Sequence, residues 1–138
     1  DLIKSRGIIP LPMGKTKIGL IDARDVALVA KTILVGEEHE NRIYELTGPE
    51  SLSLAEAAEI LSNLLGRTIH YRSPPLWLAG LMMRMQDVSS WDVRMRKQLF
   101  RMIHEGGEDK VTGDVEKISG QKPRTLEMFF REYQNTFQ

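Results

Sequence analysis

Apolar residues recur three or four positions apart through most of the chain, a spacing that predicts a series of amphipathic helices. Longer helices are expected over residues 22–36, 53–66, 76–85, 89–107 and 125–137, with a short helix over residues 112–118. Their apolar faces comprise Val26, Val29, Ala30, Ile33 and Leu34; Ala57, Leu61, Leu64 and Leu65; Trp91, Met95, Leu99 and Met102; and Phe129, Tyr133 and Phe137. The helix over residues 76–85 is apolar on nearly all sides.

Local capping signals predict where these helices begin and end. Asp22 occupies an N-cap position, with Asp25 three residues on, so two carboxylates are expected at that positive helix end. Ser53 and Glu56 form a capping box, in which each side chain binds the backbone N–H of the other. Further caps are expected at Ser89 or Ser90 and at Thr125, and helix ends at Gly36, Gly66, Gly106 with Gly107, and Gly120.

Three short strands are expected, over residues 18–21, 43–46 and 68–71, whereas the prolines and glycines of residues 7–14 predict an extended or turning connector. Residues 1–4 have no capping residue before them and resemble the tail of a helix cut by trimming; a disordered N-terminus is the alternative. We expect one α+β domain, residues 1–138, rich in helix. Its strands either complete a larger sheet or form a small one beside a helical cluster, since parallel strands need crossover helices and cover on both faces.

Composition narrows the possible partners. The 138 residues carry 19 basic and 19 acidic side chains, so no strong field favours nucleic acid or an anionic membrane. The absence of cysteine excludes disulfides, thiol catalysis and cysteine metal sites. The longest apolar run, residues 76–83, is far shorter than the ~20 residues that span a bilayer. A cytoplasmic setting is the default expectation.

Two short polar motifs resemble functional sites, one a phosphate-binding loop and the other an acid–base cluster. Gly14, Lys15 and Thr16 match the end of a phosphate-binding loop, but Ile9 stands where the first glycine is needed and a strand is expected next, so we interpret the motif as a turn. Asp22, Arg24 and Asp25 could form an acid–base cluster. We favour a structural role, in which both aspartates cap the helix and Arg24 pairs locally.

Histidines and basic residues give no clear site. His39, His70 and His104 lack the spacing of metal ligands, so no metal site is assigned. Arg94, Arg96, Lys97 and Arg101 fall along one helix flanked by Asp87, Asp92 and Glu105, which is typical of a solvated face.

The apolar helix over residues 76–85 is the most informative candidate, because Trp and Met side chains adapt to flat apolar ligands. Its stripe consists of Leu76, Trp77, Leu81, Met82 and Met85. The stripe is either the wall of a substrate pocket, part of an ordinary core, or a face left exposed when another domain is absent.

Three segments in order, IDARDVA (21–27), YELTGP (44–49) and the capped helix 53–66, resemble the NmrA-like group of the extended short-chain dehydrogenase/reductase superfamily. That group includes NAD(P)H-dependent quinone and azo-dye reductase-like proteins. Residues 111–116, 120–124 and 129–130 fit its C-terminal pattern, so the resemblance covers nearly all of this chain but only the C-terminal half of a typical member. It implies an α/β NAD(P)-binding Rossmann-type fold, of which this chain is the substrate-side portion without the dinucleotide-binding half.

The sequence departs from a complete member in two ways. It has no G-x-x-G-x-x-G or G-x-G-x-x-G turn on which a pyrophosphate could lie. It also has no Y-x-x-x-K pair, because Tyr44, Tyr71 and Tyr133 are followed four positions later by Gly48, Pro75 and Phe137. Many NmrA-like proteins are thought to lack that pair, so its absence does not separate a reductase from a sensor.

The resemblance leaves three functions open. The first is an NAD(P)H-dependent oxidoreductase acting on a quinone, azo or carbonyl-like acceptor, with this chain inactive alone and binding no cofactor by itself. In that case Trp77, Leu81, Met82 and Met85 are the expected contacts to a small apolar or aromatic substrate, and no catalytic, cofactor-binding or metal-binding residue is assigned here. The second is an NAD(P)-sensing regulator without turnover. The third is a stand-alone interaction module that self-associates through exposed apolar surface.

Overall fold

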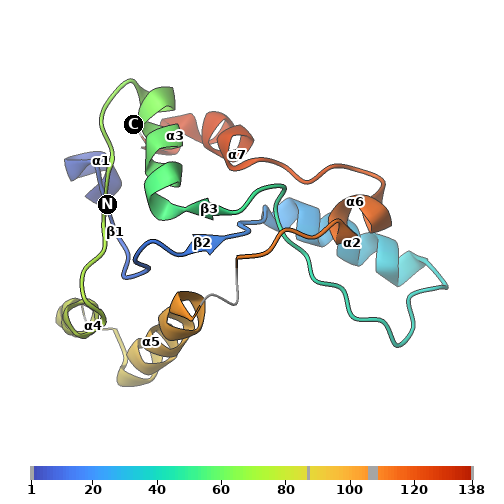
Figure 1. Ribbon diagram of the computed structural model, residues 1–138, viewed down its shortest axis with the longest axis horizontal. Coiled ribbons are helices and arrows are strands. Elements are labelled where there is room, and N and C mark those ends of the chain that lie inside the picture. The colour runs from blue at the N-terminus through green and yellow to red at the C-terminus, as the bar shows by residue number, and fades with distance from the viewer. Residues whose placement is uncertain (1, 87, 106–108, 138) are drawn as a thin grey trace.

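The computed structural model describes residues 2–86, 88–105 and 109–137 and confirms a helix-rich α+β architecture (Figure 1). The helices are α1 (Leu2–Arg6), α2 (Ala23–Val35), α3 (Leu54–Leu65), α4 (Leu76–Met85), α5 (Ser90–His104), α6 (Asp114–Ser119), α7 (Leu126–Glu132) and α8 (Gln134–Phe137). The strands are β1 (Ile8–Pro10), β2 (Lys17–Ile18), β3 (Leu52–Ser53) and β4 (His70–Arg72).

The strands form two separate pairs in the described part of the chain. β1 pairs in parallel with β4, with Ile8 opposite His70, and β2 pairs in antiparallel fashion with β3, with Lys17 opposite Ser53. An extended or turning connector was expected over residues 7–14; Ile8–Pro10 are extended, but they pair as a strand, which was not predicted. Pro10 is compatible with this strand because it lies at the last position of an edge strand, where a missing N–H costs little.

The strand expected over residues 43–46 is not formed in the structure. The pattern is present, but a strand also requires a partner, and no neighbouring strand within the described residues pairs with this segment. The other two predicted strands are displaced: β2 ends at Ile18, and β4 begins at His70 and ends at Arg72.

The local capping predictions are largely confirmed. The Asp22 side chain accepts from the Arg24 N–H, and the capping box of Ser53 and Glu56 is complete. Gly66 and Gly120 end α3 and α6 with φ of 63° and 70°. Gly36 also ends its helix, but in an extended rather than a left-handed conformation.

The remaining helix predictions are confirmed in part. Ser89 and Thr125 cap α5 and α7 with their hydroxyl groups. The expected stop at Gly106 and Gly107 lies outside the described residues. The last predicted helix is divided at Tyr133 into α7 and α8.

One core forms around α3. Leu61 is completely buried, and it packs with Ala58, Ile69 and Phe130, which come from α3, the segment before β4, and α7. A second, smaller cluster joins Met13, Ile18, Leu54 and Ile103, and so connects the strands to the end of α5. We call α2, α3, α6 and α7 with the four strands the packed region.

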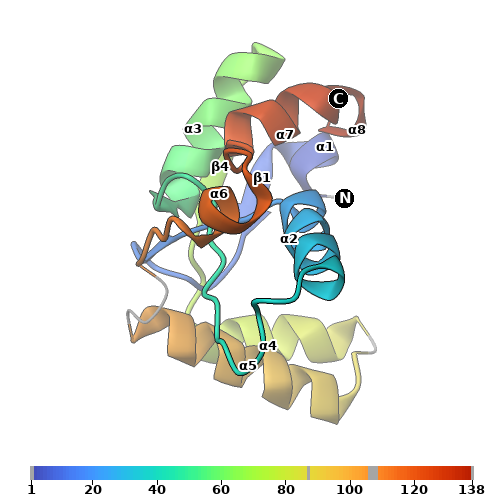
Figure 2. The ribbon, with the colours of Figure 1, turned by 90° about the vertical axis from the view of Figure 1, so that its right-hand side faces the viewer.

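Helices α4 and α5 form a hairpin that lies to one side of the packed region (Figure 2). The two helices pack against each other, and Ile103 near the end of α5 joins the hairpin to the second cluster. We call this element the α4–α5 hairpin.

Candidate functional site

The boundaries of α4 agree with the predicted helix, and the side that it buries consists of small residues. Pro75 precedes its first turn, which suits a ring that lacks an N–H. Ala79 and Gly80 are buried, and a Cβ at Gly80 would overlap the Lys97 side chain of α5. The small residues therefore allow a close approach of α5, so the larger apolar residues of α4 point elsewhere.

The predicted substrate residues lie on the exposed face of α4. Trp77 is 67% exposed, Leu81 50%, Met82 38% and Met85 79%. The interpretation of this stripe as ordinary core does not hold for these four residues. They form an open apolar face rather than a closed cavity within the described chain.

Helix α5 adds a second apolar stripe that sequence reasoning did not connect with α4. Trp91, Met95, Leu99 and Met102 share one face, and each is between 44% and 67% exposed. The signal was present in their spacing of three and four residues, but spacing alone does not show whether a face is covered.

The basic residues of α5 are also on its surface. Arg94, Arg96 and Arg101 are exposed, while Lys97 is half-buried because it lies across Gly80. The three arginines form the solvated face that was predicted, whereas Lys97 does not belong to it.

A cleft of about 360 Å³ separates the base of the hairpin from the loop before β2. Its lining includes Pro12, Ser73, Leu76, Phe100 and His104, so it begins at the first residue of α4 but contains none of the four predicted substrate residues. Here the Gly14 N–H donates to the Ser73 Oγ at 2.9 Å.

A larger cleft, of about 650 Å³, lies beside the same loop and is lined in part by Lys15, Lys17 and Tyr71. The Tyr71 hydroxyl is already used, because it donates to the Leu11 carbonyl at 2.9 Å and accepts from the Met13 N–H at 3.2 Å. Lys15 lies in a turn followed by strand β2, which confirms the turn interpretation of residues 14–16.

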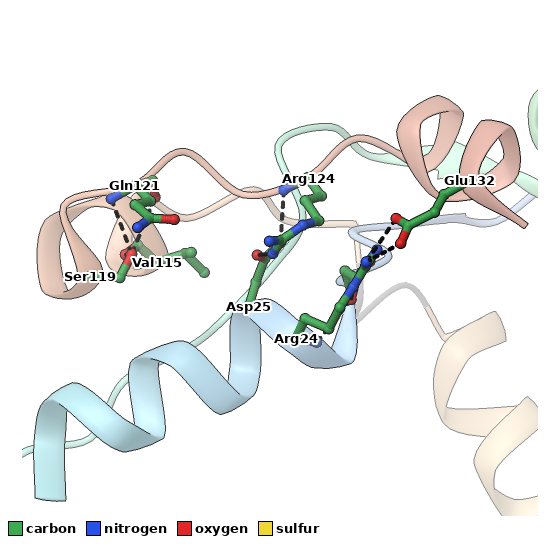
Figure 3. A network of polar contacts seen from close by, with 8 residues as sticks. Arg24, Asp25, Val115, Ser119, Gln121, Arg124 and Glu132 are labelled. Atoms are coloured by element: carbon green, nitrogen blue, oxygen red, sulfur yellow. Dashed lines mark hydrogen bonds and ion pairs between the residues drawn. The ribbon is translucent and has the colours of Figure 1, made fainter.

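The charged cluster at the start of α2 is structural (Figure 3). The Arg24 guanidinium binds the Asp22 carboxylate, and this hydrogen bond is the main reason that the pKa of Asp22 falls to about 2. Arg24 also binds both carboxylate oxygens of Glu132, at 2.8 and 2.7 Å, which ties α2 to α7. Hydrogen bonds to Asp22 and Glu132 raise the pKa of Arg24 further.

The predicted capping role was wrong for Asp25. Its carboxylate is buried, accepts the Arg124 backbone N–H at 2.7 Å and pairs with the Arg124 guanidinium. Asp25 therefore fixes the loop between α6 and α7, where Ser119 also binds the backbone of Val115 and Gln121 (Figure 3). Since Asp22 and Asp25 are each paired with a guanidinium, the cluster does not offer a free acid or base.

The structure adds little for the other candidates. The Nδ1 of His39 lies 2.8 Å from the Tyr44 hydroxyl. No group of three possible metal ligands occurs within residues 2–86, 88–105 and 109–137. In the same ranges, no helix is both long and apolar enough to cross a bilayer.

Comparison with known proteins gives a consistent set of relatives, although no family model matches the chain. It is 33% identical over 127 residues to an uncharacterized oxidoreductase, YesF, of Bacillus subtilis, which covers 92% of this chain and 44% of that protein. It is 32% identical over 135 residues to an NAD(P)H azoreductase of Xenophilus azovorans, covering 98% of this chain and 47% of the relative. The chain thus spans about half the length of these relatives.

Solved structures show the same fold. The NADPH-dependent quinone oxidoreductase QOR2 of Escherichia coli matches with a TM-score of 0.85 and 19% identity, over 98% of this chain and 48% of that one. The triphenylmethane reductase of Citrobacter sp., solved with NADP(H), matches with a TM-score of 0.82 and 22% identity, over 95% of this chain and 46% of that one. The fold of the chain is therefore that of about half of an NAD(P)-binding oxidoreductase.

Proposed function

We propose that this chain is the substrate-side, C-terminal half of an NAD(P)H-dependent oxidoreductase that reduces a quinone, azo or carbonyl-like acceptor. The observation that carries the proposal is the match to an NAD(P)H azoreductase along 98% of the chain, at about half the length of that relative. The common fold with a quinone oxidoreductase over 98% of the chain supports it.

The residues of this chain do not fit the cofactor itself. Pyrophosphate groups bind where a glycine-rich turn leads from a strand into a helix whose N-terminal N–H groups are free. The sequence has no such turn, and the N-termini of α2 and α3 are already occupied by the side chains of Asp22 and of Ser53 with Glu56. We therefore assign the NAD(P)H site to the half of the full-length protein that corresponds to the part of these relatives not matched by this chain.

The exposed face of α4 is the part of this chain that we assign to the acceptor. Trp77, Leu81, Met82 and Met85 offer a large, adaptable apolar surface, which suits a flat aromatic molecule. Large apolar patches on a protein surface are typical of binding sites. A nicotinamide supplies hydride, whereas this face binds and orients the acceptor and excludes water from it.

Enzyme assays of a chimera test the proposal. In the chimera, the unmatched half of the Xenophilus azovorans azoreductase precedes this chain, and NADPH oxidation is followed with a panel of quinones and azo dyes. Turnover is the expected result. Cofactor binding without turnover would favour the NAD(P)-sensing regulator instead.

A charge on α4 tests the site. Leu81→Arg is expected to raise the KM for the acceptor at least about tenfold with a smaller change in kcat, because acceptor binding to this face would then bury a charge. Met128→Arg is the matched control, since Met128 is 56% exposed on α7. An unchanged acceptor KM in the Leu81 variant contradicts the assignment of this face.

A calorimetric titration of NADPH and then NADH into the 138-residue chain tests where the cofactor binds. No binding up to millimolar cofactor is expected. Micromolar binding would contradict the assignment of the cofactor to the other half.

A further inference from the structure

The total charge of the chain is balanced, but positive charge is concentrated on the α4–α5 hairpin. Residues 76–104 contain five basic side chains against two acidic ones, a net charge of +3, and the rest of the chain has 14 against 17, a net charge of −3. None of the five basic side chains forms an ion pair with a described residue, whereas Arg24 of α2 and Arg131 of α7 do. The charge of the hairpin is therefore available to an external partner.

Helix α5 places part of this charge beside its exposed apolar face, which we call the α5 stripe. The stripe consists of Trp91, Met95, Leu99 and Met102, each between 44% and 67% exposed. At 3.6 residues per turn, Arg94 and Arg101 lie along one side of the stripe, and Arg96 lies on the other side. The remaining side of the helix is attached to the protein through the buried Val93 and Ile103. An apolar stripe with basic residues on both flanks is typical of helices that lie at a membrane surface.

Both tryptophans of the chain are exposed on the hairpin. Trp77 in the first turn of α4 and Trp91 in the first turn of α5 are each 67% exposed. Tryptophan combines an apolar ring with a polar N–H and is enriched where hydrocarbon meets water. In Figure 2 the hairpin lies along one end of the molecule, apart from the helices of the packed region. A surface can therefore approach the hairpin from that end.

Charge and apolar area together favour a lipid surface over other partners. A nucleic acid would bind the arginines but would leave the α5 stripe without an apolar contact. A second copy of the chain, docked through the same face, would bring two positively charged surfaces together. An anionic bilayer satisfies both features, because its phosphates pair with guanidinium groups and its acyl boundary accepts the apolar side chains.

We propose that α5 docks the protein on the surface of an anionic membrane. The α5 stripe lies in the headgroup region, and Arg94, Arg96 and Arg101 bind lipid phosphates. The docking itself does not require the proposed function. Its consequence for the acceptor rests on that function: because α4 packs against α5, the acceptor face lies close to a bilayer in which apolar quinones dissolve.

Co-sedimentation with lipid vesicles tests the docking. The 138-residue chain is mixed with vesicles of phosphatidylcholine alone, or of phosphatidylcholine and phosphatidylserine at about two to one. It should bind the anionic vesicles at least about tenfold more tightly, and the difference should shrink as salt is raised, because salt screens exposed charges. A folded chimera with the azoreductase half should show the same preference. Equal binding to both vesicles, no binding, or loss of the preference in the chimera would overturn the proposal.

Charge reversal distinguishes this surface from a general effect of net charge. Arg94→Glu combined with Arg101→Glu should weaken binding to the anionic vesicles at least about tenfold, with an unchanged circular dichroism spectrum because both side chains are exposed. Lys117→Glu combined with Lys122→Glu is the matched control, since it changes the net charge equally at exposed positions outside the hairpin. An equal loss in both double variants would contradict the assignment to α5.

Tryptophan fluorescence tests whether the stripe enters the lipid. Trp77→Phe leaves Trp91 as the only tryptophan, and its emission should shift to shorter wavelength on anionic vesicles, because the ring leaves water. Binding without such a shift would show a purely electrostatic contact and contradict the role of the stripe.

The same variants identify a different occupant. Tighter binding to duplex DNA than to anionic vesicles would assign the surface to nucleic acid. Dimerisation without vesicles that is lost in the arginine double variant would assign it to a second copy of the chain. Either result would overturn the proposal.

Docking and catalysis can fail separately. Binding of the chimera to anionic vesicles without NADPH turnover supports the docking surface and contradicts the oxidoreductase function. Turnover without vesicle binding supports the function and contradicts the docking surface.

Discussion

Helices α3 and α4 are similar in length, at 12 and 10 residues, and both are rich in apolar residues, but only α3 buries large apolar side chains. Helix α3 directs Leu54, Ala57, Ala58 and Leu61 inward, as a surface helix normally does. Helix α4 buries only Ala79 and Gly80 and leaves Trp77 and Met85 at least two-thirds exposed. Helix α3 of the packed region thus has its apolar face covered, whereas the α4–α5 hairpin presents large apolar side chains that are free to contact a ligand or a partner.

Truncation of one leucine in each region gives the largest expected contrast. Leu61→Ala should lower the free energy of unfolding by about 3–5 kcal/mol, because it empties a fully buried site among Ala58, Ile69 and Phe130. Leu81→Ala should cost less than about 1 kcal/mol, since half of that side chain is already in water. Urea denaturation of both variants measures the difference. Similar losses would show that the hairpin is packed in solution and would remove the contrast.

The buried ion pair of the packed region should have the next largest effect. Asp25→Ala leaves Arg124 without its partner and should cost about 2–4 kcal/mol; the Arg124 side chain is 34% exposed, which favours the lower end. The control is Arg131→Ala, which removes the exposed pair with Glu127 and should cost about 0.5 kcal/mol or less. Thermal unfolding measures both. A small loss for Asp25→Ala would show that the loop between α6 and α7 is held by other contacts.

The failure to foresee this pair from sequence has a physical reason. Capping is local, so Asp22, Ser53 with Glu56, and Thr125 could be assigned from residues two or three positions away. The Asp25 carboxylate also lies in a first turn, where a cap was the simplest interpretation. Its actual partner, Arg124, is 99 positions away, and only the tertiary fold brings the two together.

Strands were harder to predict than helices for the same reason. β1 depends on β4, which lies more than 60 residues later, so the local prolines of residues 7–14 gave the wrong indication. The segment 43–46 has the right pattern, but no strand among the described residues pairs with it, so the expected strand is not formed. The exposed stripe of α4 was found from sequence, but spacing could not show that it is uncovered.

Alanine substitutions at two glycines should give a smaller difference in stability between the packed region and the α4–α5 hairpin. A Cβ at Gly48 would overlap the backbone carbonyl of Leu20, which cannot move without shifting the packed region, so Gly48→Ala should cost about 1–3 kcal/mol. A Cβ at Gly80 would meet only the flexible end of Lys97. Gly80→Ala should therefore change stability by less than about 1 kcal/mol, since alanine also favours the helix. Denaturation midpoints of the two variants measure these changes. A large loss of stability in Gly80→Ala would mean that α4 and α5 are packed as rigidly as the packed region.

The smallest expected effect is the pH dependence of the capping box that begins α3. Hydrogen bonds from the Ser53 backbone N–H, the Ser53 hydroxyl and Lys17 hold the pKa of Glu56 at about 2, below its ordinary value of 4.5. A lowered pKa in the folded chain means that the ionised carboxylate stabilises the fold above pH 4.5, and that this contribution is lost as the pH falls toward 2. The urea midpoint should therefore fall over that range, and less steeply in Glu56→Gln. Ser53→Ala should keep part of the dependence, because the backbone N–H remains. An equal pH dependence in Glu56→Gln and the unsubstituted chain would show that the capping box does not contribute to the stability of the packed region. That stability would then come from the buried contacts.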